Sequence, residues 1–248
     1  MREVWAKAED GSVVCVHLPP IWSRIEDALD AGWWPPVGLT LIGDESAVNP
    51  TAFVDVTHLG LIDREQSSLS ELESDIGLFT AAHMTSRVAL HAALISDGNK
   101  SIAFPGRSKT GKSSLCLAAL DAGLIVHSDE YTLVHPVTGL VSGWHRRLRI
   151  REGRGSRRIP IPQRPNEDLV LTHVAHLQFN ESIQSKSSLD VRVISHSQTA
   201  MCLVDNAVAA QLRPELVLEA ALKIARLAVG IQGRRGDASQ ALHELFGR

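Results

Sequence analysis

The chain has 248 residues, of which 44% are hydrophobic and 21% are charged, and its formal net charge is −3. This composition is typical of a soluble globular protein with enough apolar material for a principal domain and a smaller companion. The near-neutral charge disfavours general nucleic-acid binding, and no run approaches the roughly 18 apolar residues that a membrane-spanning helix needs.

The first residues and the cysteines indicate the cellular compartment of the protein. The first residues, MREVWAKAED, lack an apolar core flanked by basic residues, so we expect no signal peptide. Cys15, Cys116 and Cys202 are far apart and form no CxxC pair, which favours small buried thiols in a reducing compartment. We therefore expect a cytoplasmic protein that does not bind membranes.

Residues 1–75 form the first predicted region, a small α/β region without a motif that assigns a role. Alternating apolar residues predict strands at 12–18, 37–43 and 51–60, and a short helix is predicted within 19–32. A longer helix is predicted at 68–84.

The second predicted domain, residues 76–248, begins with a hairpin. Residues 87–96 and 101–104 are apolar and β-rich, and the Asp-Gly turn of DGNK separates them. The chain then enters GRSKTGKS and a helix over 112–121, with Gly123 suited to the left-handed position after a helix. A buried strand, LIVHSDE, follows and ends in acids.

The remaining elements complete an α/β class. A hairpin over 131–144 has its turn at Pro136 to Gly139, and an arginine-rich loop is predicted at 145–160. Strands are predicted at 168–179 and 189–195, and helical periodicity extends over 215–231 and 237–246.

The stretch GRSKTGKS fits the phosphate-loop pattern GxxxxGK[ST], with a predicted strand before it and a helix after it. Glycines permit the tight turns that aim successive N–H groups at an anion, and the helix start adds its positive dipole end. Lys112 is expected to reach the β- and γ-phosphates, and the Ser113 hydroxyl to ligate Mg²⁺. The predicted nucleotide-binding residues are Gly106, Arg107, Ser108, Lys109, Thr110, Gly111, Lys112, Ser113 and Ser114.

Asp129 and Glu130 follow Lys112 after only one helix and one turn. Since open α/β sheets gather their ligands at the carboxyl ends of strands, both acids are predicted to face the phosphates. One of the two carboxylates is then expected to hold Mg²⁺ and the other to accept a proton from an attacking hydroxyl, and we assign the metal role to Asp129 together with Ser113. The alternative is an exposed acidic turn. His91 lies 21 residues before Lys112, and taken alone it would be a core histidine.

His91, the loop GRSKTGKSS and the stretch DAGLIVHSDEYTLVHPVTG together resemble the HPr kinase/phosphorylase family and its smaller HPr-kinase-like relatives. The resemblance covers residues 87–150 and implies a core related to phosphoenolpyruvate carboxykinase. It also implies a kinase that uses ATP and Mg²⁺ to phosphorylate a serine of a peptide or small protein. Lys112 would hold the transferred group, Glu130 would accept the proton, and His91 would support it.

Some relatives of this size tailor peptide natural products, including lasso-peptide precursors, and others form hexamers. A small peptide substrate and self-association are therefore expectations to test. The chain departs from the family in having Glu130 as the second acid, where the family has Asp. Residues 149–155, RIREGRG, match a later signature of the family only weakly, so Glu152 is a weak candidate for a second metal ligand.

Seven arginines lie between His145 and Pro160. Guanidinium groups bind phosphates and carboxylates in a bidentate manner, so this segment is predicted to bind an acidic or phosphorylated ligand. A solvated loop and a nucleic-acid contact are the alternatives, the latter disfavoured because no aromatics are interleaved to stack bases. The residues assigned to substrate binding are Arg146, Arg147, Arg149 and Arg151.

Two further function classes remain open. A regulatory or assembly ATPase or GTPase would hydrolyse nucleotide with the same loop and acids but would not need His91. A scaffold that only binds nucleotide is disfavoured by the complete set of Lys112, Ser113 and Asp129. The HxxH pair of His173 and His176 is predicted to place its rings on opposite faces of a strand, which argues against a metal site there.

Overall fold

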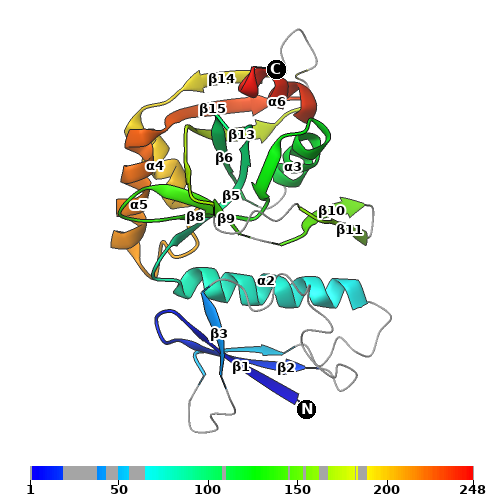
Figure 1. Cartoon of the computed structure of the whole chain (residues 1–248), viewed down its shortest axis with the longest axis vertical. Coiled ribbons are helices and arrows are strands. Elements are labelled where there is room, and N and C mark those ends of the chain that lie inside the picture. Colours follow the sequence, from blue (N-terminus) through cyan, green and yellow to red (C-terminus); the bar gives the residue numbers. More distant parts are fainter. Residues whose placement is uncertain are drawn as a thin grey trace. The chain divides into compact units, whose positions relative to one another are not determined.

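A computed structural model of the chain describes residues 2–18, 38–42, 50–55, 65–107, 110–144, 146–152, 155–161, 167–181, 183 and 189–247. The chain divides into two compact units, Met1–Ser86 with Arg151–Ser156, and Arg87–Ile150 with Arg157–Arg248. The mixed α/β class predicted from the sequence is confirmed (Figure 1). Within the described ranges, no helix is both long and apolar enough to cross a membrane.

The first unit contains a small sheet and one long helix. Its elements are β1 (Arg2–Ala8), β2 (Val13–Leu18), β3 (Leu39–Ile42), β4 (Ala52–Asp55) and α2 (Glu65–His83). The sheet order is β3-β1-β2-β4, with β4 parallel to β2 and the other pairs antiparallel. The strands predicted at 12–18 and 37–43 and the helix predicted at 68–84 are confirmed. The strand predicted at 51–60 is confirmed where it is described, and the helix predicted within 19–32 lies outside the described residues.

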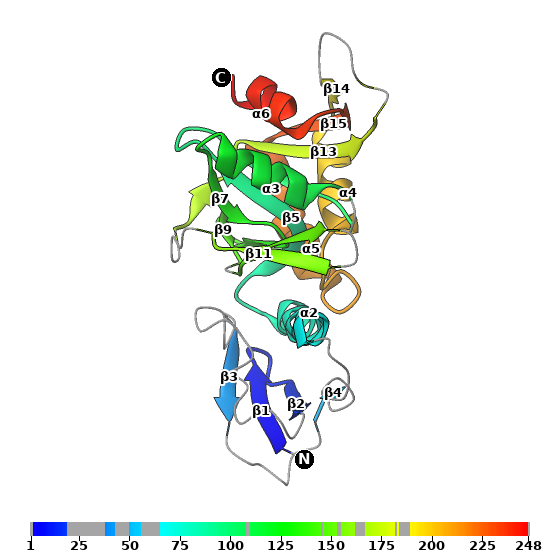
Figure 2. The ribbon, with the colours of Figure 1, turned by 90° about the vertical axis from the view of Figure 1, so that its right-hand side faces the viewer.

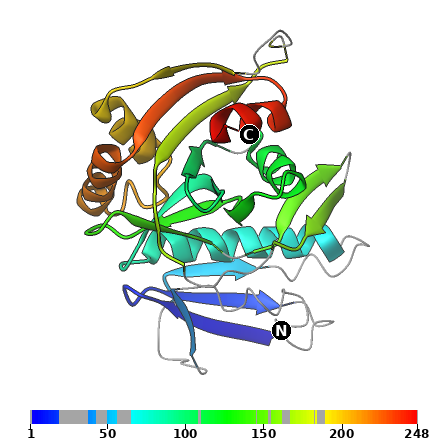
Figure 3. The same ribbon diagram turned by 45° about the horizontal axis from the view of Figure 1, so that its top comes forward.

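The second unit is built on a curled mixed sheet (Figure 3). Its strands are β5 (Val88–Ser96), β6 (Ser101–Pro105), β7 (Ile125–Ser128), β8 (Tyr131–Val134), β9 (Leu140–Gly143), β12 (Leu169–Val170), β13 (His173–Phe179), β14 (Leu189–Val193) and β15 (Val229–Arg235). The order is β12-β9-β8-β5-β6-β13-β15-β14. Strand β7 pairs with the C-terminal end of β5, and β8 pairs with its N-terminal end. The predicted hairpins over 87–104 and 131–144 are both confirmed.

Helices cover both faces of this sheet. They are α3 (Lys112–Asp121), α4 (His196–Asp205), α5 (Pro214–Leu227) and α6 (Ala238–Phe246). The pairs α4/α5 and α3/α6 lie on opposite sides of the strands (Figures 1 and 2). Leu94 and Val174 belong to the core under α4 and α5, whereas their neighbours Ile95 and Ala175 belong to the core under α3 and α6. This alternation follows from the two-residue period of a strand.

Strand direction brings the predicted site together. Both β6 and β7 run antiparallel to β5, which lies between them, so β6 and β7 point the same way. The loop that follows β6 and the acids that follow β7 therefore emerge at the same end of the sheet. Asp129 and Glu130 occupy the short step at which the chain leaves β7 and enters β8, and both strands pair with β5.

Two predictions of secondary structure were wrong, and one helix was not predicted. Residues 145–160 contain a hairpin of β10 (Leu148–Glu152) and β11 (Gly155–Ile159) rather than a loop. The periodicity over 215–231 ends with α5, and residues 229–231 belong to β15, because β13 and β14 pair with that segment on its two sides. Helix α4 was not predicted, although Ser195 and Gln198 form a capping box at its start.

Candidate active site

The predicted phosphate loop begins where β6 ends, and its first residue is tied to β5. The Gly106 N–H donates to the carbonyl of His91 over 3.0 Å. The Lys112 ammonium donates to the carbonyl oxygens of Gly106 (2.5 Å) and Arg107 (3.0 Å), so it lies across the mouth of the loop. The side chain of Thr110 also donates to the Arg107 carbonyl. Ser108 and Lys109 lie outside the described residues.

Helix α3 starts directly after the loop, as the pattern predicts. Its N-cap, Gly111, has a φ of 86°, in the left-handed region that favours glycine. No side chain caps this helix start and no acidic residue lies in its first turn. The first N–H groups of a helix have no intrahelical acceptor, so here they remain donors for an anion in the loop.

The predicted magnesium ligands meet at the start of α3. The Ser113 Oγ and the Asp129 Oδ2 are 3.5 Å apart, and the Asp129 side chain is only 2% exposed. A hydroxyl and a carboxylate are oxygen donors of the kind that Mg²⁺ prefers, and nucleotide phosphates usually complete its coordination. The two side chains therefore fit the role that the sequence predicted for them.

Glu130 lies beside Asp129 and shares a counter-ion with it. The Arg146 Nε lies 3.4 Å from the Asp129 Oδ1, and the Arg146 Nη1 pairs with the Glu130 Oε2. The backbone fixes the acid pair opposite β5, because the Ala92 N–H donates to the Glu130 carbonyl. Arg146 thus binds both acids. Sequence analysis had assigned this residue to substrate binding and did not predict these contacts.

His91 lies at the centre of these elements. Its backbone carbonyl holds Gly106, and its ring centroid lies 4.9 Å from that of Tyr131, the residue after the acid pair. Burial, aided by the positive charges of Lys112 and Arg146, lowers the pKa of His91 to about 4. The imidazole is therefore neutral at physiological pH and retains a nitrogen lone pair that can accept a hydrogen bond.

Charges of both signs are confined in this site. Burial lowers the pKa of Lys112, and the nearby carboxylates of Glu130 and Asp129 oppose that shift. A partly desolvated ammonium and guanidinium interact strongly with added negative charge, because their environment screens them less than water does. The arrangement is suited to holding polyphosphate while two carboxylates serve a metal ion and a proton.

Arg235 is a residue of this site that sequence analysis missed. It ends β15, is 2% exposed, and donates from Nη2 to the Gly111 carbonyl over 3.0 Å. The Phe179 ring lies 5.3 Å from its guanidinium carbon. In sequence, Arg235 is 124 positions from Gly111, so only the strand order brings the two together. No local pattern signals it.

The other predicted residues have mixed placements. Ser114 is exposed on α3, and Arg147 is also exposed, whereas Arg149 is half-buried on β10. The side chains of Arg151 and Glu152 lie outside the described set. The alternation of β13 places His173 and His176 on opposite faces, which confirms the prediction for the HxxH pair.

No protein-family model matches the chain, and no curated protein matches it.

Proposed function

We propose that the second unit is a kinase that uses ATP and Mg²⁺ to phosphorylate a serine hydroxyl of a peptide or small protein. The observation that carries the proposal is the approach of Ser113 to Asp129 at the start of α3, with Glu130, Lys112 and His91 gathered around them. Phosphoryl transfer requires a loop that binds phosphate, side chains that bind a metal ion, and a carboxylate that accepts the proton. The resemblance to HPr-kinase-like proteins points to the same chemistry and to peptide tailoring as its setting.

Lys112 and the uncapped N–H groups of α3 bind the phosphate chain of ATP in this proposal. The Lys112 ammonium would exchange the carbonyls of Gly106 and Arg107 for phosphate oxygens. Ser113 and Asp129 would hold Mg²⁺, and the ion would supply positive charge that offsets charge developing on the phosphates. Arg146 keeps Asp129 and Glu130 in place through its contacts with both.

Glu130 is the proposed proton acceptor. The serine oxygen forms the new bond to the γ-phosphorus, the bond from that phosphorus to the β–γ bridging oxygen breaks, and ADP leaves. The hydroxyl proton passes to the Glu130 carboxylate, which is more accessible than that of Asp129, with 18% against 2% of the side chain exposed. The neutral ring of His91 orients the hydroxyl or the carboxylate by a hydrogen bond.

Intact-mass spectrometry tests the proposal. The full chain is incubated with Mg²⁺, ATP labelled at the γ-phosphate, and a peptide fraction from cell extract. We expect a labelled peptide whose formation is lost with Lys112→Ala. His91→Ala should reduce transfer by roughly 10²-fold or more, the size of a general acid–base contribution. His173→Ala on β13 is the matched control, because among the described residues its ring interacts with Thr172 and Lys100 and not with the residues of the candidate site.

Label released only as free phosphate would overturn the kinase in favour of a nucleotide hydrolase. In that case Lys112→Ala would still abolish turnover, whereas His91→Ala would leave it intact. Full phosphate transfer by His91→Ala would contradict the role given to that residue.

A further inference from the structure

A hollow lies on the sheet of the second unit, on the face opposite α3. It has a volume of about 420 Å³ and is lined by side chains from β13, β14 and β15. We call it the β14 hollow. Its polar lining residues are His176, Gln178, Asp190, Arg192, Gln232 and Arg234.

The pairing register orders these six side chains into two rows across the three strands. Residues paired across neighbouring strands present their side chains to the same face, so each row is a line of adjacent polar groups. The rows are His176–Gln232–Arg192 and Gln178–Arg234–Asp190. The rows lie about 7 Å apart along the strands, and each extends about 10 Å across them.

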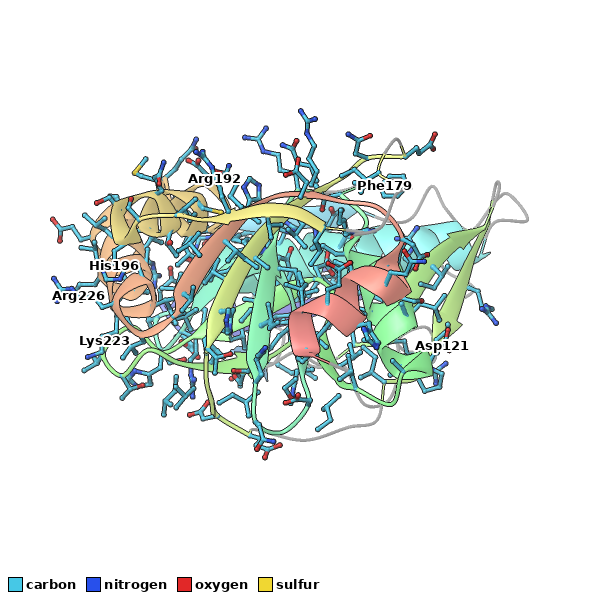
Figure 4. The ribbon with its side chains drawn as sticks, turned by 90° about the horizontal axis from the view of Figure 1, so that it is seen from above. Asp121, Phe179, Arg192, His196, Lys223 and Arg226 are labelled. Atoms are coloured by element: carbon cyan, nitrogen blue, oxygen red, sulfur yellow. The ribbon has the colours of Figure 1, made fainter. Side chains whose placement is uncertain are left out.

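Helix α4 packs on the row of the sheet next to the hollow. Val174 and Gly230 lie one row earlier on the same face, where Val174 packs in the core under α4 and α5. A Cβ on Gly230 would lie 1.9 Å from the Thr199 hydroxyl of α4, so α4 closes directly on the sheet there. Beyond that row lie the six polar residues that line the hollow, and Arg192 is exposed on the edge strand β14 (Figure 4).

The polar groups of the hollow are available to a ligand. Among the described residues, none of the six side chains forms a hydrogen bond or ion pair with another. Gln178, Asp190, Arg192 and Arg234 are exposed, so a ligand can reach them from solvent. A ligand that supplies both acceptors and donors would satisfy them.

The chemistry of the hollow selects a short acidic peptide segment. Two guanidinium groups face one carboxylate, so the lining favours a ligand with negative charge, and guanidinium binds carboxylate in a bidentate manner. The amides of Gln178 and Gln232 each offer a donor and an acceptor, which matches the N–H and C=O of a peptide bond. The area of about 7 by 10 Å accommodates two or three extended residues.

We propose that the β14 hollow binds an acidic peptide segment, with Arg192 and Arg234 binding its carboxylates and the two glutamines binding its backbone. The hollow lies on the opposite face of the sheet from His91 and α3, so this binding is separate from phosphoryl transfer. The inference does not rest on the proposed kinase function.

Amide chemical shifts of the ¹⁵N-labelled full chain provide the test. The probe is the peptide Ac-Gly-Glu-Ala-Glu-Gly-NH₂, which has no hydroxyl to phosphorylate, and its counterpart has Gln at both Glu positions. We expect the Glu peptide to shift amides of β13, β14 and β15, and this binding to weaken as salt is added. The Gln peptide should bind about tenfold less tightly, as expected for the loss of charge-assisted hydrogen bonds.

Variants locate the binding. The double change Arg192→Gln and Arg234→Gln should weaken the Glu peptide by about tenfold or more. Arg226→Gln, at an exposed position of α5, removes one charge away from the hollow and should leave affinity unchanged (Figure 4). If the double variant does not fold, Arg192→Gln alone is used, because that side chain is exposed at the sheet edge.

Three outcomes would overturn the proposal. They are equal binding of the Glu and Gln peptides, unchanged affinity in the arginine variants, and binding of citrate without binding of the Glu peptide. The last would assign the hollow to small carboxylates. Because Lys112→Ala leaves the hollow intact, peptide binding by that variant separates this inference from the proposed kinase function.

Discussion

The His91 ring illustrates how neighbouring charges set the behaviour of a single residue. Its pKa is lowered to about 4, chiefly by burial and then by Lys112 and Arg146. An unfolded histidine takes up its proton near pH 6.5. Between these two values the unfolded chain binds more protons than the folded chain, so lowering the pH through this window destabilises the fold.

We predict that His91→Gln removes this part of the pH dependence. The wild-type free energy of unfolding should fall as the pH is lowered from about 6.5 to 4. In the variant this fall should be smaller by about 1–2 kcal/mol, a modest difference because solvent partly screens the half-buried ring. Urea unfolding at a series of pH values measures the difference. Lys112→Met removes one of the two positive charges that lower the pKa of His91. The pH range over which His91 makes stability depend on pH should therefore become narrower. Parallel curves for His91→Gln and the wild type would contradict the prediction.

Arg146 and Arg147 are adjacent but have different surroundings. Arg146 is 12% exposed in its side chain and pairs with both Asp129 and Glu130, whereas Arg147 is exposed. Removing one partner of a buried ion pair leaves the other charge desolvated. We therefore predict that Arg146→Met lowers the free energy of unfolding by about 2–3 kcal/mol.

Arg147→Met is the control for that prediction. A surface substitution of this kind should change the free energy of unfolding by no more than about 0.5 kcal/mol. Chemical denaturation of the two variants side by side gives the comparison. Equal effects would show that the contacts of Arg146 with the acids contribute little to stability.

At the scale of elements, helix α3 is bounded by two glycines with left-handed backbones. Gly111 precedes it with a φ of 86°, and Gly123 follows it with a φ of 69°. Their surroundings differ. A Cβ at Gly111 would lie 2.2 Å from the Arg235 Nη2, whereas among the described residues nothing beyond the chain neighbours lies within 4 Å of one at Gly123.

We predict that Gly123→Ala costs about 1 kcal/mol, the strain of a left-handed alanine, and that Gly111→Ala costs about 1–2 kcal/mol more. The excess arises because Arg235 must move and lose its bond to the Gly111 carbonyl. Thermal or urea unfolding measures both variants. Gly123→Asn is the matched control, because asparagine tolerates this backbone better than alanine. Equal costs at the two glycines would mean that Arg235 does not hold the loop.

At the scale of the whole molecule, the chain consists of two units, and the candidate site belongs to the second. Its described residues come from β5, the loop before α3, the step between β7 and β8, and the end of β15. Ligand binding stabilises the structure that contains the site. Stabilisation by bound nucleotide should therefore be confined to the second unit.

We predict that ATP with Mg²⁺ slows amide hydrogen exchange in residues 87–135 and 229–236, and leaves β1, β2 and α2 of the first unit unchanged. At a hundredfold excess over its dissociation constant, the ligand contributes about 2.7 kcal/mol to the state that binds it. Exchange measured by mass spectrometry resolves the two regions. Lys112→Ala should abolish the effect, and protection in the first unit instead would contradict this assignment.

Sequence predicted the site best where its parts are local. The loop between β6 and α3 depends on glycine conformations and a helix start, and the spacing of GRSKTGKS encodes both. The left-handed Gly123 after α3 and the turn at 136–139 were predicted for the same reason. The hairpin of β5 and β6, which carries His91 on its first strand, was predicted because an Asp-Gly turn fixes the pairing of the strands beside it.

Prediction failed where pairing partners decide structure. The segment after α5 continues a helical pattern in sequence, but β13 and β14 pair on either side of it, and sheet hydrogen bonds outweigh a modest helix preference. The arginines after position 145 led to the prediction of a ligand-binding loop, whereas β10 and β11 form a hairpin. Charge content describes the surface of a segment and does not specify its backbone pairing.

The sequence by itself determined the phosphate-loop pattern, the acid pair after the next strand and the mixed α/β class, since each depends on residues near one another in the chain. Only the tertiary structure decided that Arg146 binds both acids, that Arg235 holds the Gly111 carbonyl and that six polar side chains line one hollow. Those contacts depend on strand order and register, which are fixed by burial over the whole sheet and not by any short stretch of sequence.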